Sequence, residues 1–279
     1  MLYYLNFPLL QVILYFTTCN SDPVYEKERN QQHRIKPNAM FIKTIPLPAG
    51  FRHIRGSDSA FADWLFSKPL KKDNTIYLYN GSRKANQHAQ FAVLDMEIGK
   101  KDLLQCADAV IKLRAGFLFQ NGKADQINFR STTGTWLSFL QWQQGYSWKV
   151  QDNKLERIQR TIRFRDSVKS VEAFMDIVYS YCGTYSLSRQ LKPVKGNIQP
   201  GDVFIQGGFP GHAVIVLSVA ENRNGKKIFM LAQGYMPAQD IHVLRNPGNP
   251  GLSPWYSEEE IYPLVTPQWK FNKGSLMRW

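Results

Sequence analysis

Two short apolar runs near the end of the chain constrain its fold more than any other feature. Residues 212–217 (HAVIVL) and 227–233 (KIFMLAQ) are rich in apolar and β-branched side chains, and turn-forming residues 221–225 separate them. This pattern predicts an antiparallel hairpin. Residues 203–205 are another strand-like segment, and a glycine-rich turn at 207–211 joins them to the hairpin. The last third of the chain is therefore expected to build an antiparallel sheet.

Helical patterns and shorter strand-like runs precede this hairpin. Apolar spacing and capping signals predict helices within 56–70, 103–119 and 167–181, and further strands within 75–79 and 91–96. Asp102 is the expected N-terminal cap of the second helix. The mixture predicts an α+β protein in which helices pack on an antiparallel sheet.

The first 19 residues predict an export signal. Residues 1–18 carry no charged side chain, and the sequence turns polar after Cys19. The run is interrupted by Pro8 and is shorter than the roughly 20 residues of a membrane-spanning helix, whereas signal peptides have apolar regions of this size. Cleavage before Cys19 would leave a cysteine for lipidation, and the lipid would anchor the protein to a membrane of the cell envelope. Plain secretion and an uncleaved N-terminus are the alternatives.

The rest of the chain is expected to form a polar tether and one folded domain. Residues 20–45 are polar, mixed in charge and without periodicity, which is typical of a tether. Residues 46–279 are expected to fold as a single domain, because a chain with 43% hydrophobic residues can bury one substantial core. The protein is expected to be a monomer.

The basic charge limits the expected partners. The formal net charge is +13, and residues 1–19 contribute none of it. Such a charge favours peptidoglycan, another acidic envelope polymer or anionic lipid. Nucleic acid is not expected, because the basic residues are scattered and no nucleic-acid motif accompanies them. No cofactor or metal is expected.

The helix at 103–119 carries a candidate nucleophile, Cys106. The positive end of a helix dipole favours a thiolate, although capping by Asp102 would place Cys106 about four residues inside the helix and leave most of the activation to a neighbouring imidazolium. Two structural interpretations stand beside this one. Cys106 falls at helical spacing with Val110, Leu113 and Phe117 and could belong to a core-facing stripe, and it could form a disulfide with Cys182.

His212 and Gln233 are the candidate partners of this thiol. His212 begins an apolar strand, where an imidazole can face a cleft as a general base. A hairpin centred on residues 222 and 223 would set Gln233 opposite His212, and a register shift of two residues would keep both on one face. The Gln233 carbonyl oxygen could then orient the imidazole as the third member of a triad.

Two family resemblances follow from the order of these motifs. Pro200-Gly201-Asp202 before a strand, followed by Gly211-His212-Ala213-Val214, resembles the NlpC-type cell-wall peptidases, which implies a papain-like fold. The cysteine motif departs from that family, because Gln105-Cys106-Ala107-Asp108-Ala109 stands where NlpC enzymes show Asp-Cys-Ser-Gly-Phe. The chain more closely resembles a family of uncharacterised bacterial lipoproteins from Bacteroidetes, domain of unknown function 4846. That resemblance covers nearly all of the mature chain, including 98–103, 105–110, 113–115, 183–188, 210–216, 231–233 and 235–239.

Several other polar and aromatic residues are weaker candidates. Gln105 could donate a hydrogen bond to an oxyanion, or it could be a solvated helix residue. Tyr235, Trp136 and Trp142 could line a substrate groove, or they could belong to the core. Asp108 and Arg114 are expected at the surface or behind the site.

These features together predict a cell-envelope cysteine hydrolase that cleaves an amide or an ester bond through a Cys106 thioester. The first substrate expected is the amide bond of a peptidoglycan stem peptide. An acyltransferase or a lipid hydrolase would share the same residues. The main alternative is a catalytically inactive lipoprotein that binds cell-wall peptide or a partner protein in the same cleft.

Overall fold

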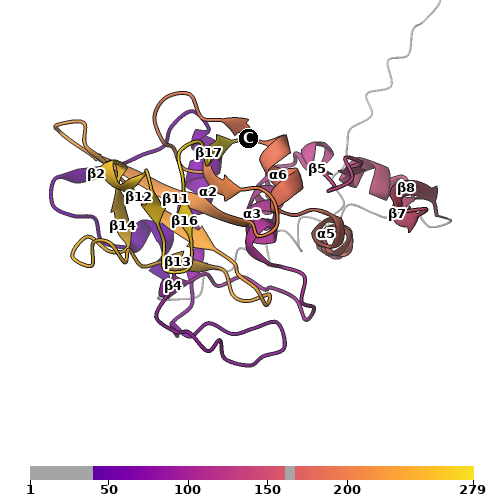
Figure 1. The fold of residues 1–279 in the computed structure, drawn as a ribbon, viewed down its shortest axis with the longest axis horizontal. Helices are drawn as coiled ribbons and strands as arrows, with labels where there is room; N and C mark the ends of the chain where they lie inside the picture. The colour runs from indigo at the N-terminus through magenta and orange to yellow at the C-terminus, as the bar shows by residue number, and fades with distance from the viewer. Residues whose placement is uncertain (1–39, 161–166) are drawn as a thin grey trace, which may run out of the picture. The chain divides into compact units, whose positions relative to one another are not determined.

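The computed structural model describes residues 40–160 and 167–279 (Figure 1). The predicted signal peptide, the lipidation residue Cys19 and most of the predicted tether lie outside the described residues. Residues 40–45, the predicted end of the tether, are folded, since Ile42 is 0% and Ile45 2% exposed. The folded part therefore begins earlier than residue 46, because these two apolar side chains join the core.

The described residues form α-helices, 3-10 helices and short strands. The α-helices are α2 (Ser59–Phe66), α3 (Cys106–Gln120), α4 (Phe139–Gln143), α5 (Val168–Tyr181) and α6 (Thr184–Gln190), and the 3-10 helices are η1 (Ile42–Thr44), η2 (Ala124–Gln126) and η3 (Glu258–Glu260). The strands of the main sheet are β2 (Phe51–Ile54), β4 (Gln90–Val93), β9 (Lys192–Pro193), β10 (Val203–Gln206), β11 (His212–Asn222), β12 (Lys227–Gln233), β13 (His242–Leu244), β14 (Trp255–Ser257) and β17 (Leu276–Arg278). Four two-stranded sheets pair β1 (Met40–Phe41) with β3 (Pro69–Leu70), β5 (Asn128–Arg130) with β6 (Trp136–Ser138), β7 (Tyr146–Gln151) with β8 (Lys154–Gln159), and β15 (Leu264–Val265) with β16 (Lys270–Phe271).

The main sheet confirms the predicted antiparallel architecture. Its strands follow the order β4-β13-β12-β11-β10-β17-β9, while β14 also pairs with β12 and β2 with β11, and every pairing is antiparallel. The predicted hairpin is β11 and β12. The strand predicted at 75–79 is wrong: this segment makes only isolated bridges, because the chain turns back at Asn80-Gly81 before a ladder can form.

Helix α3 packs against the sheet through β11 and β12 (Figure 1). Cys106, Val110, Leu113 and Phe117 are all buried, so the core-facing stripe exists and includes the candidate nucleophile. The approach is close at Gly234, just after β12, where an added Cβ would lie 2.8 Å from the Gln105 carbonyl oxygen. The start of α3 and the end of β12 therefore lie side by side.

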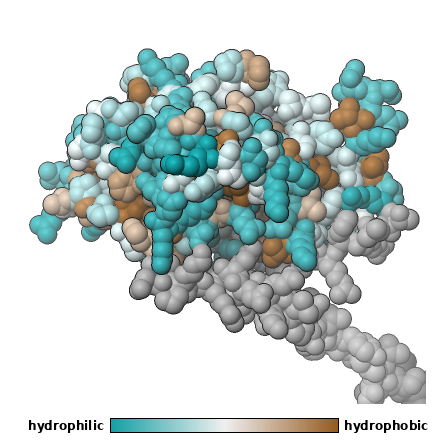
Figure 2. Space-filling view, turned by 90° about the horizontal axis from the view of Figure 1, so that it is seen from below, coloured by the Kyte–Doolittle hydropathy of each residue, from teal (hydrophilic) through white to brown (hydrophobic). Residues whose placement is uncertain are grey.

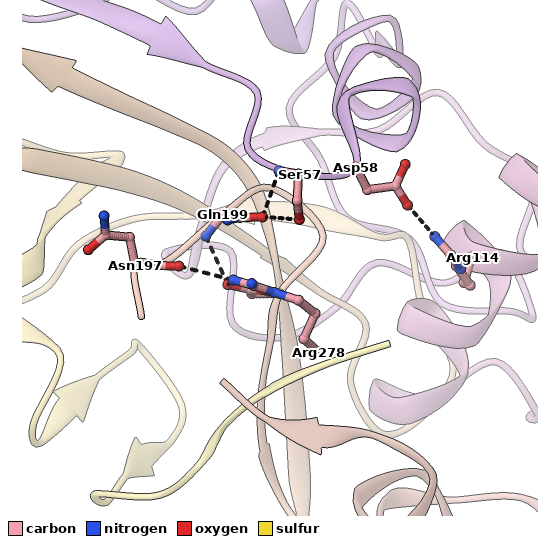
Figure 3. Close-up of polar contacts among 7 residues, drawn as sticks. Ser57, Asp58, Arg114, Asn197, Gln199 and Arg278 are labelled. Carbon is pink, nitrogen blue, oxygen red and sulfur yellow. Dashed lines mark hydrogen bonds and ion pairs between the residues drawn. The ribbon is translucent and has the colours of Figure 1, made fainter. Parts of the chain in front are cut away.

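The Pro200-Gly201-Asp202 motif forms the turn that leads into β10. Asp202 is 1% exposed and binds Arg278 through two contacts, Nε to Oδ1 at 2.6 Å and Nη2 to Oδ2 at 2.8 Å. Arg278 also donates to the Asn197 carbonyl oxygen at 3.0 Å, beside Gln199 (Figure 3). The Asp202 carboxylate therefore fastens β17 to this turn.

A second set of contacts in the same region connects α2 to its neighbours (Figure 3). Gln199 Oε1 accepts hydrogen bonds from the N–H and the hydroxyl of Ser57, at 2.9 and 2.7 Å. Asp58 caps α2 by accepting from the Phe61 N–H, and its other carboxylate oxygen lies 3.1 Å from Arg114 Nη1. Arg114, expected at the surface or behind the site, thus joins α3 to the start of α2.

One face of the described region is mainly polar. The face in Figure 2 is largely hydrophilic, and its hydrophobic side chains form small, separate groups. Among residues 40–160 and 167–279, no helix combines the length and the apolar character needed to cross a membrane.

Candidate active site

Cys106 is the first residue of α3, and Gln105 is the N-cap. The expected cap, Asp102, instead accepts a hydrogen bond from the Ala238 N–H at 2.7 Å, so that prediction is wrong. The helix starts later than expected because Asp102 is engaged by the loop after β12. The Cys106 sulfur consequently lies in the first turn, where unpaired N–H groups and the helix dipole favour an anion.

The thiol lies against the strand that carries His212. The backbone N–H groups of Ala107 and Ala213 act on the Cys106 sulfur in the direction of a lower pKa. Ala213 is the second residue of β11 and follows His212 directly. The structure therefore brings the predicted nucleophile to the start of the predicted base's strand.

A β-bulge aligns His212 with Gln233. The register between β11 and β12 shifts by one residue between Val216 and Ser218. Without this shift, the register near the turn would place His212 and Gln233 on opposite faces of the sheet, because side chains alternate along a strand. With it, Gln233 lies two residues from the position opposite His212, on the same face, and its Oε1 is 2.8 Å from His212 Nε2.

The hydrogen bonds around Gln233 fix the tautomer of His212. His242 Nδ1 lies 2.9 Å from the Asp240 carbonyl oxygen, which can only accept, so neutral His242 presents an unprotonated Nε2. Gln233 Nε2 donates to that nitrogen at 3.3 Å and to Gln268 Oε1 at 2.8 Å. The Gln233 carbonyl oxygen must then accept from His212 Nε2–H, which leaves the Nδ1 lone pair of His212 free to take a proton.

Burial keeps both histidines neutral. His212 is 2% exposed, and its ring lies 5.3 Å from the ring centres of Tyr235 and Trp269 and 5.9 Å from that of Phe271. Desolvation lowers the pKa of His212 to about 4 against the opposing effect of the Gln233 hydrogen bond, and lowers the pKa of His242 to about 3.

The thiol is neutral as well. Cys106 is 7% exposed, and desolvation raises its pKa to about 11, with a further contribution from Asp108. Among the described residues, no hydrogen bond joins the Cys106 sulfur to the His212 ring. The resting pair is therefore a thiol and an imidazole rather than a thiolate and an imidazolium.

This protonation state predicts slow alkylation of Cys106. At pH 7.5, iodoacetamide is expected to modify Cys106 about 100-fold more slowly than in the unfolded chain, because the thiolate fraction falls tenfold for each unit by which the pKa rises. The rate should increase up to about pH 11. Peptide mapping by mass spectrometry separates Cys106 from Cys19 and Cys182, and fast modification of folded Cys106 at neutral pH would instead indicate an ion pair.

Of the two positions expected for Asp108, the structure gives the one behind the site, and Cys182 forms no disulfide. Asp108 is 5% exposed rather than at the surface, its Oδ2 accepts from the Gln105 N–H at 3.1 Å, and burial raises its pKa to about 8. The disulfide considered from the sequence is absent, since Cys106 and Cys182 are both free. Cys182 instead ends helix α5 as its C-cap.

The structure separates the aromatic groove candidates. Tyr235 is partly exposed and packs edge-on against His212. Trp136 is 52% exposed on β6, in a separate two-stranded sheet. Trp142 cannot line a groove, because it is 2% exposed and donates its indole N–H to Ser170 Oγ at 3.2 Å. Gln105, the oxyanion candidate, donates its amide to Asp102 Oδ1 at 3.4 Å.

Three residues beside the site were missed by sequence reasoning: His242, Gln268 and Lys84. His242 pairs directly opposite Gln233 in the β12–β13 ladder, so the short apolar run around it could have suggested a strand next to the predicted hairpin. Gln268 and Lys84 reach the site from segments outside the named strands, and no local pattern marks them. Within the described ranges, no three His, Cys, Asp or Glu side chains are grouped as metal ligands.

Gly211 makes the turn before His212 possible. A Cβ at this position would lie 2.3 Å from Thr184 Oγ1 and 2.5 Å from the Gly208 carbonyl oxygen. Gly211→Ala is expected to lower the free energy of unfolding by about 2 kcal/mol and the melting temperature by about 5 °C, because backbone cannot yield as a flexible side chain would. Gly251→Ala is the control, since its nearest atom would be 3.8 Å away. Equal melting temperatures for the two variants in calorimetry would contradict the close packing.

The fold and this cluster define a mixed α/β protein, mostly antiparallel in its sheets, with a buried Cys, His and Gln at the junction of a helix and a hairpin. The chain belongs to the family described as domain of unknown function 4846, which matches residues 41–278. Comparison with curated proteins and with solved structures gave no match. The family prediction is therefore confirmed, while the bacterial origin, the lipid anchor and the NlpC resemblance stay predictions.

Proposed function

We propose that this protein is a cysteine hydrolase of the cell envelope with a papain-like, NlpC-type arrangement of its site. The observation that carries the proposal is the fixed tautomer of His212, whose free Nδ1 belongs to a ring at the start of β11, where the Cys106 thiol packs. A base with one nitrogen held by an acceptor and the other free is the arrangement that nucleophilic catalysis by a thiol requires.

The proposed reaction passes through a thioester. The Cys106 sulfur attacks the carbonyl carbon of the substrate while His212 Nδ1 takes the thiol proton. The tetrahedral adduct collapses as His212 returns this proton to the leaving amine or alcohol. A water molecule, deprotonated by His212, then attacks the thioester, and the second adduct releases the acid and regenerates the thiol. In this mechanism, first-turn N–H groups of α3 stabilise the oxyanion.

Peptidoglycan stem peptide is the proposed substrate. The net charge of +13 suits an acidic envelope polymer, and a lipid anchor on Cys19 would hold the domain at a membrane facing the periplasm or at the cell surface. The resemblance to cell-wall peptidases points the same way.

Incubation with purified sacculi tests this proposal. The full chain is expected to release soluble muropeptides that mass spectrometry identifies, and Cys106→Ala is expected to release none. Cys182→Ala is the matched control, because Cys182 is the other free cysteine of the described region. Release by Cys106→Ala at the wild-type rate would refute the thioester mechanism.

A second function is favoured by the neutral resting pair. A thiol with a pKa of about 11 and a base with a pKa of about 4 do not form an ion pair unaided, and this favours a site that binds cell-wall peptide without cleaving it. In that case, sacculi would retain both wild type and Cys106→Ala in a sedimentation assay, and neither would release products.

A further inference from the structure

Lys84 is a buried cation beside the proposed site. It is 8% exposed, and its Nζ lies 3.1 Å from Gln268 Oε1 and 5.4 Å from the centre of the Tyr235 ring. Across residues 40–160 and 167–279, no carboxylate forms an ion pair with this ammonium group. A desolvated charge without a counter-ion is unfavourable, because neither an amide oxygen nor a ring face replaces a carboxylate.

Two routes connect Lys84 to His212. Gln268 Oε1 accepts from Lys84 and from the Nε2 of Gln233, the residue that orients His212. The Tyr235 ring packs against the His212 ring and also faces Lys84. The Lys84 charge is close enough to act toward a lower pKa of His212. The ammonium group therefore lies beside the proposed base, connected to it through Gln268 and Gln233 and through Tyr235.

The backbone of Lys84 is fixed, and among the described residues Gln268 is the one hydrogen-bond acceptor of its ammonium group. Its N–H donates to the Ile76 carbonyl oxygen at 3.0 Å, and its own carbonyl accepts from Gln87 Nε2 at 2.7 Å. An ammonium group has three N–H donors, and Gln268 accepts from one of them. Desolvation lowers the pKa of Lys84 to about 8, so the group is still mainly protonated at neutral pH.

We infer that Lys84 binds a carboxylate of the substrate, so that the site selects acyl compounds carrying a free carboxylate near the bond that is cleaved. The carboxylate completes the coordination of the ammonium group and supplies the missing counter-ion. This inference rests on the proposed function for the identity of the ligand as a substrate. Binding of a carboxylate to Lys84 does not depend on whether the protein is catalytically active.

Two matched esters test the selectivity. Mono(4-nitrophenyl) glutarate carries a carboxylate, and 4-nitrophenyl methyl glutarate is its neutral counterpart. For the wild type, kcat/KM is expected to be about tenfold higher for the carboxylate ester, which corresponds to one charge-assisted contact. Lys84→Met should reduce this ratio to about one, and Lys84→Arg should restore most of it. Lys72→Met, at an exposed lysine of the same segment, is expected to leave the ratio unchanged.

A binding measurement separates the inference from the proposed function. Calorimetric titration of sodium glutarate into Cys106→Ala protein, with sodium chloride at equal ionic strength as the reference, should detect binding that Lys84→Met removes. Hydrolysis of both esters at equal rates by the wild type, with no glutarate binding, overturns the inference and leaves the hydrolase proposal standing. Lys84-dependent glutarate binding without hydrolysis of either ester supports the anion site and counts against the hydrolase proposal alone. If Lys84→Met does not fold, Lys84→Gln, which removes the charge and keeps a polar side chain, provides the same test.

Discussion

Replacing His212 with alanine is expected to lower kcat/KM for the proposed hydrolysis by about 10²- to 10⁴-fold, which is the usual contribution of a general base. The physical reason is the state of the resting thiol. Because burial raises the pKa of Cys106 to about 11, the sulfur carries its proton and cannot attack until a neighbouring group removes it. In the proposed mechanism His212 Nδ1 takes this proton, since Gln233 accepts from Nε2.

The control for this variant is His88→Ala, at an exposed histidine outside the site. His88→Ala should hydrolyse at the wild-type rate, while added imidazole should restore part of the activity of His212→Ala. Gln233→Leu should also lose activity, because His212 Nε2 would lose its acceptor and the ring its fixed tautomer. If His212→Ala kept more than about a tenth of the wild-type kcat/KM, another base would have to be sought.

Replacing Arg278 with alanine is expected to lower the free energy of unfolding by about 3–5 kcal/mol and the melting temperature by about 10 °C. The variant would leave the Asp202 carboxylate, 1% exposed, without its two contacts to the guanidinium group. The exposed ion pair of Arg55 with Asp63 is the control, because both side chains are more than half exposed and Arg55→Ala should cost less than about 1 kcal/mol.

The loss of stability in Arg278→Ala is expected to depend on pH. Burial acts to raise the pKa of Asp202 and Arg278 opposes it, so the pKa rises further when Arg278 is removed. A carboxyl group whose pKa is higher in the folded than in the unfolded state costs stability when ionised, and the cost disappears as the pH falls below the folded pKa. The difference in melting temperature between wild type and Arg278→Ala should therefore narrow from pH 7 toward acid. A difference that widens would show that Asp202 is not the group left unpaired.

Local sequence patterns were sufficient to predict much of the fold. The predicted helices within 56–70, 103–119 and 167–181 correspond to α2, α3 and α5, and the hairpin strands correspond to β11 and β12. These segments are long, strongly periodic or bounded by turn residues, so local preference and burial agree. The segment at 75–79 has strand-forming residues, but its side chains and backbone are used by loop contacts that sequence does not encode locally.

The site was predictable only in part, because its members come from distant segments. The positions of Cys106, His212 and Gln233 follow from the helix and the hairpin register, and the structure places the latter two on one face. The prediction of Asp102 as the cap of α3 is wrong, since Asp102 accepts from the Ala238 N–H, far along the chain, and Gln105 becomes the N-cap. Lys84 and Gln268 depend on tertiary packing of irregular segments. Their burial could not be inferred from residue type, because lysine and glutamine are usually exposed.

The bulge in β11 determines where the hairpin can change in length. Deleting one residue between Val216 and Ser218 would leave the ladder hydrogen bonds available. It would, however, move each side chain at the start of β11 to the opposite face of the sheet, so that His212 would point away from Gln233. Residues added to the turn at 222–226 would leave the phase of both strands intact. Length variation among related chains is therefore expected at the tip of the hairpin, and the spacing from the bulge to the histidine is expected to stay constant.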